Sequence, residues 1–91
     1  MPSIVGNLRE EYTDPLWMAK TIYARFGARI RELRKQHNWS QTYLSVHTGL
    51  SRTFISDLES GRKEPCLLSM IVLAKGFDLK LTELLDGIDD E

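Results

Sequence analysis

The chain has 91 residues, of which 42% are hydrophobic and 27% charged, so it is expected to form one small folded domain and no more. It has no apolar run near the roughly 18 residues that span a membrane, no signal peptide and a single cysteine, Cys66, which together exclude an internal disulfide and indicate a cytoplasmic protein. The net charge of −1 does not exclude a nucleic-acid partner, because residues 23–65 hold eight basic side chains against four acidic ones.

The first helix is predicted to start at Asp14 and Pro15, because a capping carboxylate followed by proline is a typical helix start. Apolar side chains then recur at alternating spacings of three and four, which places them on one face of a helix. They are Leu16, Ala19, Tyr23, Phe26, Ile30 and Leu33. Gly27 lies within this stripe, so either one helix runs to about His37 or two helices meet at Gly27. Residues 1–12 are expected to form an irregular arm.

Residues 40–61 predict two short helices joined by a tight turn. Ser40 and Ser51 suit N-cap positions, because a hydroxyl accepts a hydrogen bond from an unpaired backbone N–H. Gly49 and Gly61 stand where a left-handed residue ends a helix, and Ser45 is small enough to let the two helices cross closely. This arrangement is a helix-turn-helix, whose second helix enters the major groove of DNA.

Two more helices are expected after Pro65. The buried stripe of the first consists of Leu67, Met70, Leu73, Ala74 and Phe77. Leu68, Ile71 and Val72 fall outside that stripe, and such a surplus of apolar side chains often marks a subunit contact. The last helix contains Leu79, Leu81, Leu84 and Leu85. The fold class is therefore all-α, a compact five-helix bundle with an N-terminal extension that adds a helix or lengthens the first one.

A longer pattern surrounds the two short helices. It consists of Ile30-Arg31-Glu32-Leu33-Arg34, Ser40-Gln41, Gly49-Leu50-Ser51-Arg52-Thr53-Phe54-Ile55-Ser56, Leu58-Glu59-Ser60-Gly61-Arg62 and Leu84-Leu85. With this pattern the chain resembles the lambda repressor and Cro (XRE) family of bacterial and phage regulators. In size and in residues 52–56 it is also similar to the controller proteins of restriction–modification systems. The resemblance covers residues 23–87, with the helix-turn-helix core at 40–61, and leaves 1–22 as an N-terminal extension and 88–91 as an acidic tail.

One face of the second motif helix suits DNA. A helical wheel directs Ile55 and Leu58 to the core and leaves a polar arc opposite them. The arc residues expected to contact bases are Arg52, Thr53, Ser56 and Asp57. The guanidinium fork of Arg52 matches guanine O6 and N7, whereas Asp57 either accepts from cytosine N4, orients Arg52 or repels phosphate. The charge of +4 on residues 23–65 coincides with this helix and favours a DNA partner.

Contacts to the DNA backbone are expected around both motif helices. Gln41 begins the first of them, where backbone N–H groups favour a phosphate, and the resemblance implies that its side chain touches the DNA backbone. The full set of expected backbone contacts is Ser40, Gln41, Tyr43, Ser51, Ser60, Arg62 and Lys63. Three arginines of the first helix are weaker candidates for backbone contacts, because basic residues on a first helix are often only solvated. These are Arg25, Arg29 and Arg31.

The resemblance also implies structural roles. The family pairs the position of Glu59 with an arginine of the first helix, which Arg34 matches, so we expect these two to form a structural pair. Cys66 and Lys80 replace Ser or Thr helix caps of the family and are expected to weaken two helix starts.

Enzyme chemistry is not indicated. His37 and His47 lie ten residues apart and Cys66 stands alone, so no metal-ligand spacing is present. The glycines are isolated, and helix packing or termination explains them better than a phosphate-binding loop does. We therefore expect no catalysis, no metal and no cofactor.

Two functions fit the sequence, and both include binding of double-stranded DNA. The first is a homodimeric transcription regulator that binds an inverted-repeat operator and controls its own operon. The alternative is an antitoxin that binds a toxin and represses its own operon; RNA polymerase is a further candidate partner. A dimer or partner interface is expected at Trp17, Met18, Leu68, Ile71 and Val72. These residues suit either function. Alternatively, Trp17 and Met18 cap the core of their own subunit and do not meet a partner.

Overall fold

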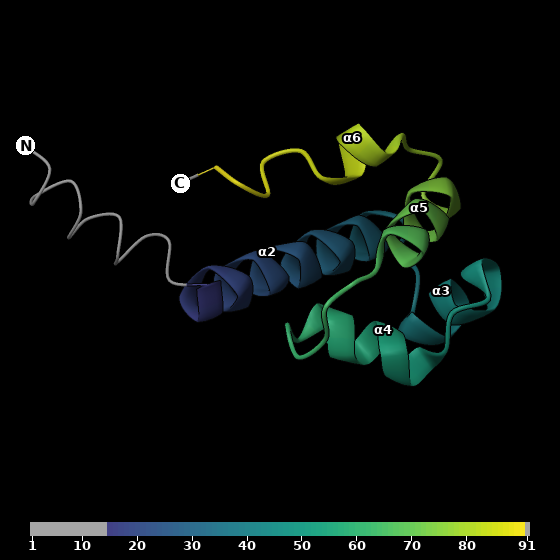
Figure 1. Ribbon diagram of the computed structural model, residues 1–91. Coiled ribbons are helices and arrows are strands. Elements are labelled where there is room, and N and C mark those ends of the chain that lie inside the picture. The colour runs from purple at the N-terminus through teal and green to yellow at the C-terminus, as the bar shows by residue number, and fades with distance from the viewer. Residues whose placement is uncertain (1–14, 91) are drawn as a thin grey trace, which may run out of the picture.

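The computed structural model describes residues 15–90, and over that range it is all-helical. The helices are α2 (Pro15–Gln36), α3 (Gln41–Thr48), α4 (Arg52–Glu59), α5 (Leu67–Gly76) and α6 (Leu81–Leu84) (Figure 1). The expected all-α class is confirmed, with the first helix lengthened at its N-terminal end. The irregular arm expected at residues 1–12 and the cap expected at Asp14 lie outside the described residues. None of the described helices is long and apolar enough to cross a membrane.

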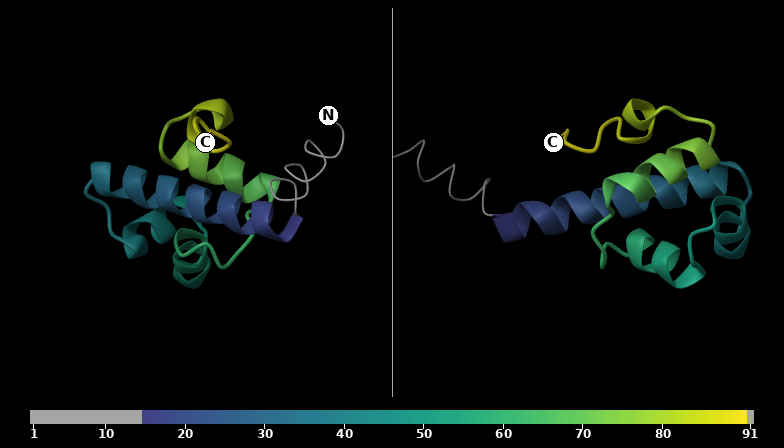
Figure 2. Two further views of the ribbon diagram at one scale, coloured as in Figure 1. Left: turned by 90° about the vertical axis from the view of Figure 1, so that its left-hand side faces the viewer. Right: turned by 45° about the vertical axis from the view of Figure 1, so that its right-hand side comes forward.

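The helix α2 is the central element of the fold. The motif helices α3 and α4 lie on one side of it, and α5 and α6 lie on the other (Figures 1 and 2). Every helix contributes to the hydrophobic core between them. The buried apolar side chains are Phe26, Ile30 and Leu33 from α2, Leu44 from α3, Ile55 and Leu58 from α4, Leu73 and Ala74 from α5, Phe77 just after α5, and Leu84 from α6.

Gly27 does not divide α2, which is one continuous helix. A Cβ atom at Gly27 would lie only 2.2 Å from the Leu58 carbonyl oxygen and 2.7 Å from that of Glu59. The glycine therefore lets the C-terminal end of α4 approach the backbone of α2 directly. Of the two arrangements that the sequence left open, the structure has the single helix.

The apolar stripes are buried only where another helix covers them. Leu16 begins the apolar stripe of α2 but is exposed, because the N-terminal turns of α2 extend beyond α4 and α5 (Figure 1). Leu67 was also expected to be buried and is 60% exposed. It is the first residue of α5, whose buried residues begin only at Ser69. The expectation for Leu67 was wrong because periodicity identifies a helical face but not how far the neighbouring helices reach.

The expected helix caps are present. Ser40 accepts a hydrogen bond from Tyr43 N and Ser51 accepts one from Phe54 N. Gly49 adopts a left-handed φ of 81°. Cys66 and Lys80 were expected to weaken two helix starts, but each of these starts still has a hydrogen bond. The Cys66 thiol accepts from Ser69 N at 3.4 Å, and Lys80 N donates to the Glu83 carboxylate at 2.8 Å.

Two arginines of α2 hold the C-terminal segment. Arg29 donates from Nε to the Leu84 carbonyl at 3.2 Å and from Nη2 to the Glu83 carbonyl at 2.9 Å. These carbonyls belong to the last turn of α6, which leaves its C=O groups unpaired. Arg25 donates to the Ile88 carbonyl at 3.0 Å. Arg25 and Arg29 therefore hold the C-terminal segment against α2, which corrects their interpretation as solvated side chains.

The close approach at Gly27 gives a stability prediction. Gly27→Ala should lower the free energy of unfolding by about 3 kcal/mol, because the added methyl group meets backbone oxygens that cannot rotate away. Gly76→Ala is the comparison, since a Cβ there meets the Thr48 methyl group and a histidine ring rather than backbone. Urea unfolding of the parent and both variants measures the difference. A Gly27→Ala variant as stable as the Gly76→Ala variant would contradict the packing described here.

Candidate nucleic-acid interface

The turn between α3 and α4 is fixed by side-chain hydrogen bonds. The Ser45 hydroxyl donates to the Leu50 carbonyl at 2.6 Å. The Thr48 hydroxyl donates to the Leu44 carbonyl at 2.7 Å and accepts from Leu50 N at 3.3 Å. Ser45 therefore does more than its small size suggested, because it also satisfies a backbone carbonyl of the turn. These bonds and the left-handed Gly49 set the angle between the two motif helices.

The two faces of α4 are sharply different. Ile55 and Leu58 are fully buried, whereas Arg52, Thr53 and Ser60 are exposed and Ser56 and Asp57 are half-buried. All four residues expected to contact bases therefore retain access to solvent. Among residues 15–90 no hydrogen-bond or ion-pair partner holds the Arg52 guanidinium, so its donors remain available to a ligand.

The expected backbone-contact residues belong to α3, to α4 or to the segments next to them. The Ser40 and Ser51 hydroxyls accept capping hydrogen bonds, which leaves the O–H of each able to donate to a phosphate. Tyr43 is exposed and rests against Trp39, with 5.0 Å between ring centroids. Lys63 is exposed in the segment that follows α4. Ser60 and Arg62 also contact Asp57, as described below.

Arg34 and Glu59 form a bidentate ion pair beneath this surface. Arg34 Nε donates to Glu59 Oε2 at 2.7 Å and Nη2 donates to Oε1 at 2.9 Å, while Nη1 donates to the Trp39 carbonyl at 2.9 Å. The two side chains are only 13% and 5% exposed. Gln41, expected to touch DNA, donates its amide to Glu59 Oε1 at 3.1 Å. One carboxylate thus joins α2, α3 and α4, and fixes the orientation of α4.

The electrostatics of this network favour an ionised Glu59. Desolvation alone raises the pKa of Glu59, but hydrogen bonds from Arg34 and Gln41 and the positive charges of Arg34 and Arg31 outweigh it and lower that pKa overall. The hydrogen bond to Glu59 raises the pKa of Arg34 against a smaller opposing desolvation. The pair therefore stays charged at neutral pH.

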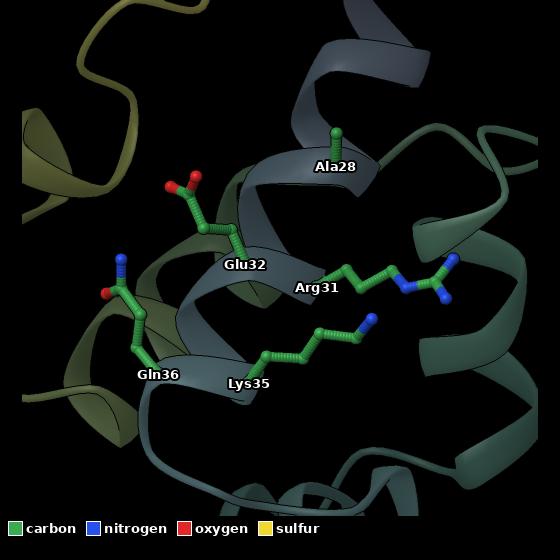
Figure 3. A pocket seen from close by; sticks show the side chains of 5 residues that line it. All are labelled: Ala28, Arg31, Glu32, Lys35 and Gln36. Atoms are coloured by element: carbon green, nitrogen blue, oxygen red, sulfur yellow. The ribbon is translucent and has the colours of Figure 1, made fainter.

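Further basic side chains lie beside the motif on α2. A shallow hollow on this helix is lined by Ala28, Arg31, Glu32, Lys35 and Gln36 (Figure 3). Figure 3 shows Arg31 and Lys35 extending to one side of the helix and Glu32 and Gln36 to the other. The positive charge of Arg31 also contributes to the lowered pKa of Glu59 on α4. The hollow is open and adds positive charge next to the motif rather than enclosing a ligand.

Sequence reasoning missed an aromatic cluster where α2, α3 and the end of α5 meet. Trp39 stacks on His37 at a centroid distance of 4.4 Å and on Phe77 at 5.5 Å. His47 packs against both Trp39 and Tyr43, and its Nε2 lies 3.0 Å from the Gly76 carbonyl oxygen. The signal in the sequence was only a concentration of aromatic and histidine residues in positions 37–47. Within residues 15–90, no group of three or more His, Cys, Asp or Glu side chains is placed to hold a metal ion.

The ion pair gives a prediction about pH. Arg34→Ala should lower the free energy of unfolding by about 3 kcal/mol at pH 7, because it leaves a buried carboxylate unpaired. The folded-state pKa of Glu59 lies below its unfolded value, so the pair's stabilisation is present above the unfolded pKa of about 4.3 and is lost as pH falls through the folded pKa. The difference between parent and variant should therefore shrink below about pH 4.

Unfolding curves at several pH values test this, with Lys35→Ala as the control because Lys35 is an exposed basic residue of the same helix. A loss in Arg34→Ala no larger than in Lys35→Ala would show that the pair does not stabilise the fold.

Comparisons with known proteins agree with this geometry. The helix-turn-helix family model HTH_3 matches residues 30–84. The control protein C.MunI of a Mycoplasma species is 31% identical over 77% of this chain and 96% of its own length, and C.BamHI of Bacillus amyloliquefaciens is 33% identical over 76% and 86%. The crystal structure of the restriction–modification controller protein C.AhdI from Aeromonas hydrophila matches with a TM-score of 0.66 and 34% identity, over 68% of this chain and 94% of that one. The chain belongs to the helix-turn-helix family of DNA-binding transcription regulators.

Proposed function

We propose that the protein is a homodimeric regulator of the restriction–modification controller type, which binds an inverted-repeat operator in the cytoplasm and controls its own operon. The observation that carries the proposal is the outward face of α4, where exposed Arg52 has no partner among the described residues while Glu59, beneath it, is tied to α2 and α3. A rigid helix that presents unengaged donors suits the major groove. The relatives named as control proteins support the controller assignment.

Arg52, Thr53 and Ser56 are the proposed base contacts. They lie in the first five residues of α4, on the side opposite the buried Ile55 and Leu58. In helix-turn-helix proteins the N-terminal residues of the recognition helix reach the base edges. The proposed contacts to phosphate and sugar surround them and position the protein without reading sequence. They are Ser40, Gln41, Tyr43, Ser51, Ser60, Arg62 and Lys63.

The short length of α4 supports a dimer. At about 1.5 Å per residue, the eight residues of α4 span roughly 12 Å and reach only a few base pairs. A two-fold dimer places two such helices about 34 Å apart on one side of the duplex, which doubles the number of bases read.

The outer face of α5 is the proposed dimer surface. Leu68 is 70% exposed, and Ile71 and Val72 are half-buried. A helix that is apolar on more than one face is normally covered on more than one side, so a second subunit is a suitable cover. Trp17 and Met18, exposed near the N-terminal end of α2, are proposed to extend this contact.

The role of Arg52 is tested by selecting bound DNA from a random duplex pool. The parent should enrich an inverted repeat, and Arg52→Ala should lose the preference at one base pair of each half-site, a loss of about 1–3 kcal/mol in discrimination. Lys63→Ala is the control and should weaken binding to all sequences alike. An unchanged base preference in Arg52→Ala would contradict the assignment, and no enrichment by the parent would contradict the proposed function itself.

The dimer surface is tested by sedimentation of the parent, Leu68→Glu and Val46→Glu. Val46 is the matched control because it is 79% exposed on α3, outside the proposed surface. The parent and Val46→Glu should sediment as dimers, and Leu68→Glu as a folded monomer, because a charge cannot be buried in an apolar contact without a partner. A monomeric parent would instead favour an interface for another protein, as in the antitoxin alternative.

A further inference from the structure

Asp57 and Arg62, which the sequence assigned to different DNA contacts, form a hydrogen-bonded ion pair with each other. Arg62 Nη2 donates to Asp57 Oδ1 at 3.1 Å, across the turn that ends α4. Asp57 was expected at a base and Arg62 at the DNA backbone. The structure places both charges at the same edge of the motif.

The backbone between these residues is held in place. Gly61 has a φ of 76°, and a Cβ at this position would lie 3.1 Å from the Ala24 Cα atom of α2. Arg62 N donates to the Asp57 carbonyl at 3.0 Å, and the Ser60 hydroxyl donates to the same oxygen at 3.1 Å. The base of the Arg62 side chain is therefore fixed relative to α4, and Asp57 fixes its far end.

The two side chains differ in what remains available for a ligand. The Asp57 side chain is 28% exposed, whereas that of Arg62 is 67% exposed. The guanidinium has five N–H donors in a planar fork, and only Nη2 is engaged by Asp57. The remaining donors are free to form charge-assisted bonds to a phosphate. An unpaired carboxylate at this edge would repel the same phosphate, so the pairing also neutralises an unfavourable charge.

We propose that Asp57 is a positioning residue that holds Arg62 ready for a DNA phosphate and does not itself read a base. This inference rests on the proposed function, specifically on Arg62 as a backbone contact. Ordering a long, flexible side chain opposes binding, and the pair with Asp57 orders Arg62 before DNA arrives. Asp57 then affects affinity for every sequence and specificity for none.

The experiment compares the parent with Asp57→Ala, Arg62→Ala and the double variant. The dissociation constant of each is measured for the duplex that the parent selects and for a shuffled duplex, over a series of salt concentrations. Asp57→Ala should weaken binding to both duplexes by the same factor, about three- to tenfold, whereas Arg62→Ala should weaken both and also reduce the salt slope by about one for each subunit, as expected for one lost phosphate contact. In the Arg62→Ala background, Asp57→Ala should cause no further weakening.

Asp57→Asn provides the rescue. Its side-chain oxygen still accepts from Arg62, so it should retain most of the parent's affinity, which a general loss of folding at this position would not explain. Thermal unfolding followed by circular dichroism checks that every variant is folded.

Three results would overturn the inference while leaving DNA binding intact. They are a relaxed preference at one base pair in Asp57→Ala, an equal effect of that substitution with and without Arg62, and no effect of it at all. If the parent binds neither duplex, the proposed function fails and the inference fails with it.

Discussion

The buried carboxylate of Glu59 is the contact on which the proposed DNA-binding surface depends. It belongs to α4 but is bonded to Arg34 of α2 and Gln41 of α3, and Arg34 in turn holds the Trp39 carbonyl. A buried ion pair adds little net stability compared with a well-packed apolar pair, but it tolerates only a narrow geometry. Its contribution is therefore the fixed orientation of α4 relative to its neighbours.

The other contacts of α2 support the same arrangement from both sides. At Gly27 the backbone of α2 meets the carbonyl oxygens at the end of α4, so the two helices are in direct backbone contact. On the opposite side, Arg25 and Arg29 bind backbone carbonyls of the C-terminal segment. Because α2 is held on both sides, it gives α4 a rigid support. A helix that reads DNA sequence needs such a support.

Sequence reasoning succeeded where the physical signal is local. The serine caps, the left-handed Gly49 and the inward Ile55 and Leu58 follow from hydrogen bonding and helical periodicity within a few residues. The Arg34–Glu59 contact, 25 residues apart in sequence, was expected only through the family resemblance. The carbonyl contacts of Arg29 were not expected because they depend on how the helices are arranged in space, and the Asp57–Arg62 bond was not expected because it depends on the turn that ends α4.

We propose above all that the outward face of α4 binds DNA. The most direct measurement is a nuclear magnetic resonance titration of the isotope-labelled protein with the duplex that it selects. We predict the largest shifts at residues 40–43 and 52–62, with α5 little affected because the proposed dimer already covers it. Shifts centred on α5 or the N-terminal end of α2, with residues 52–56 unchanged, would contradict it.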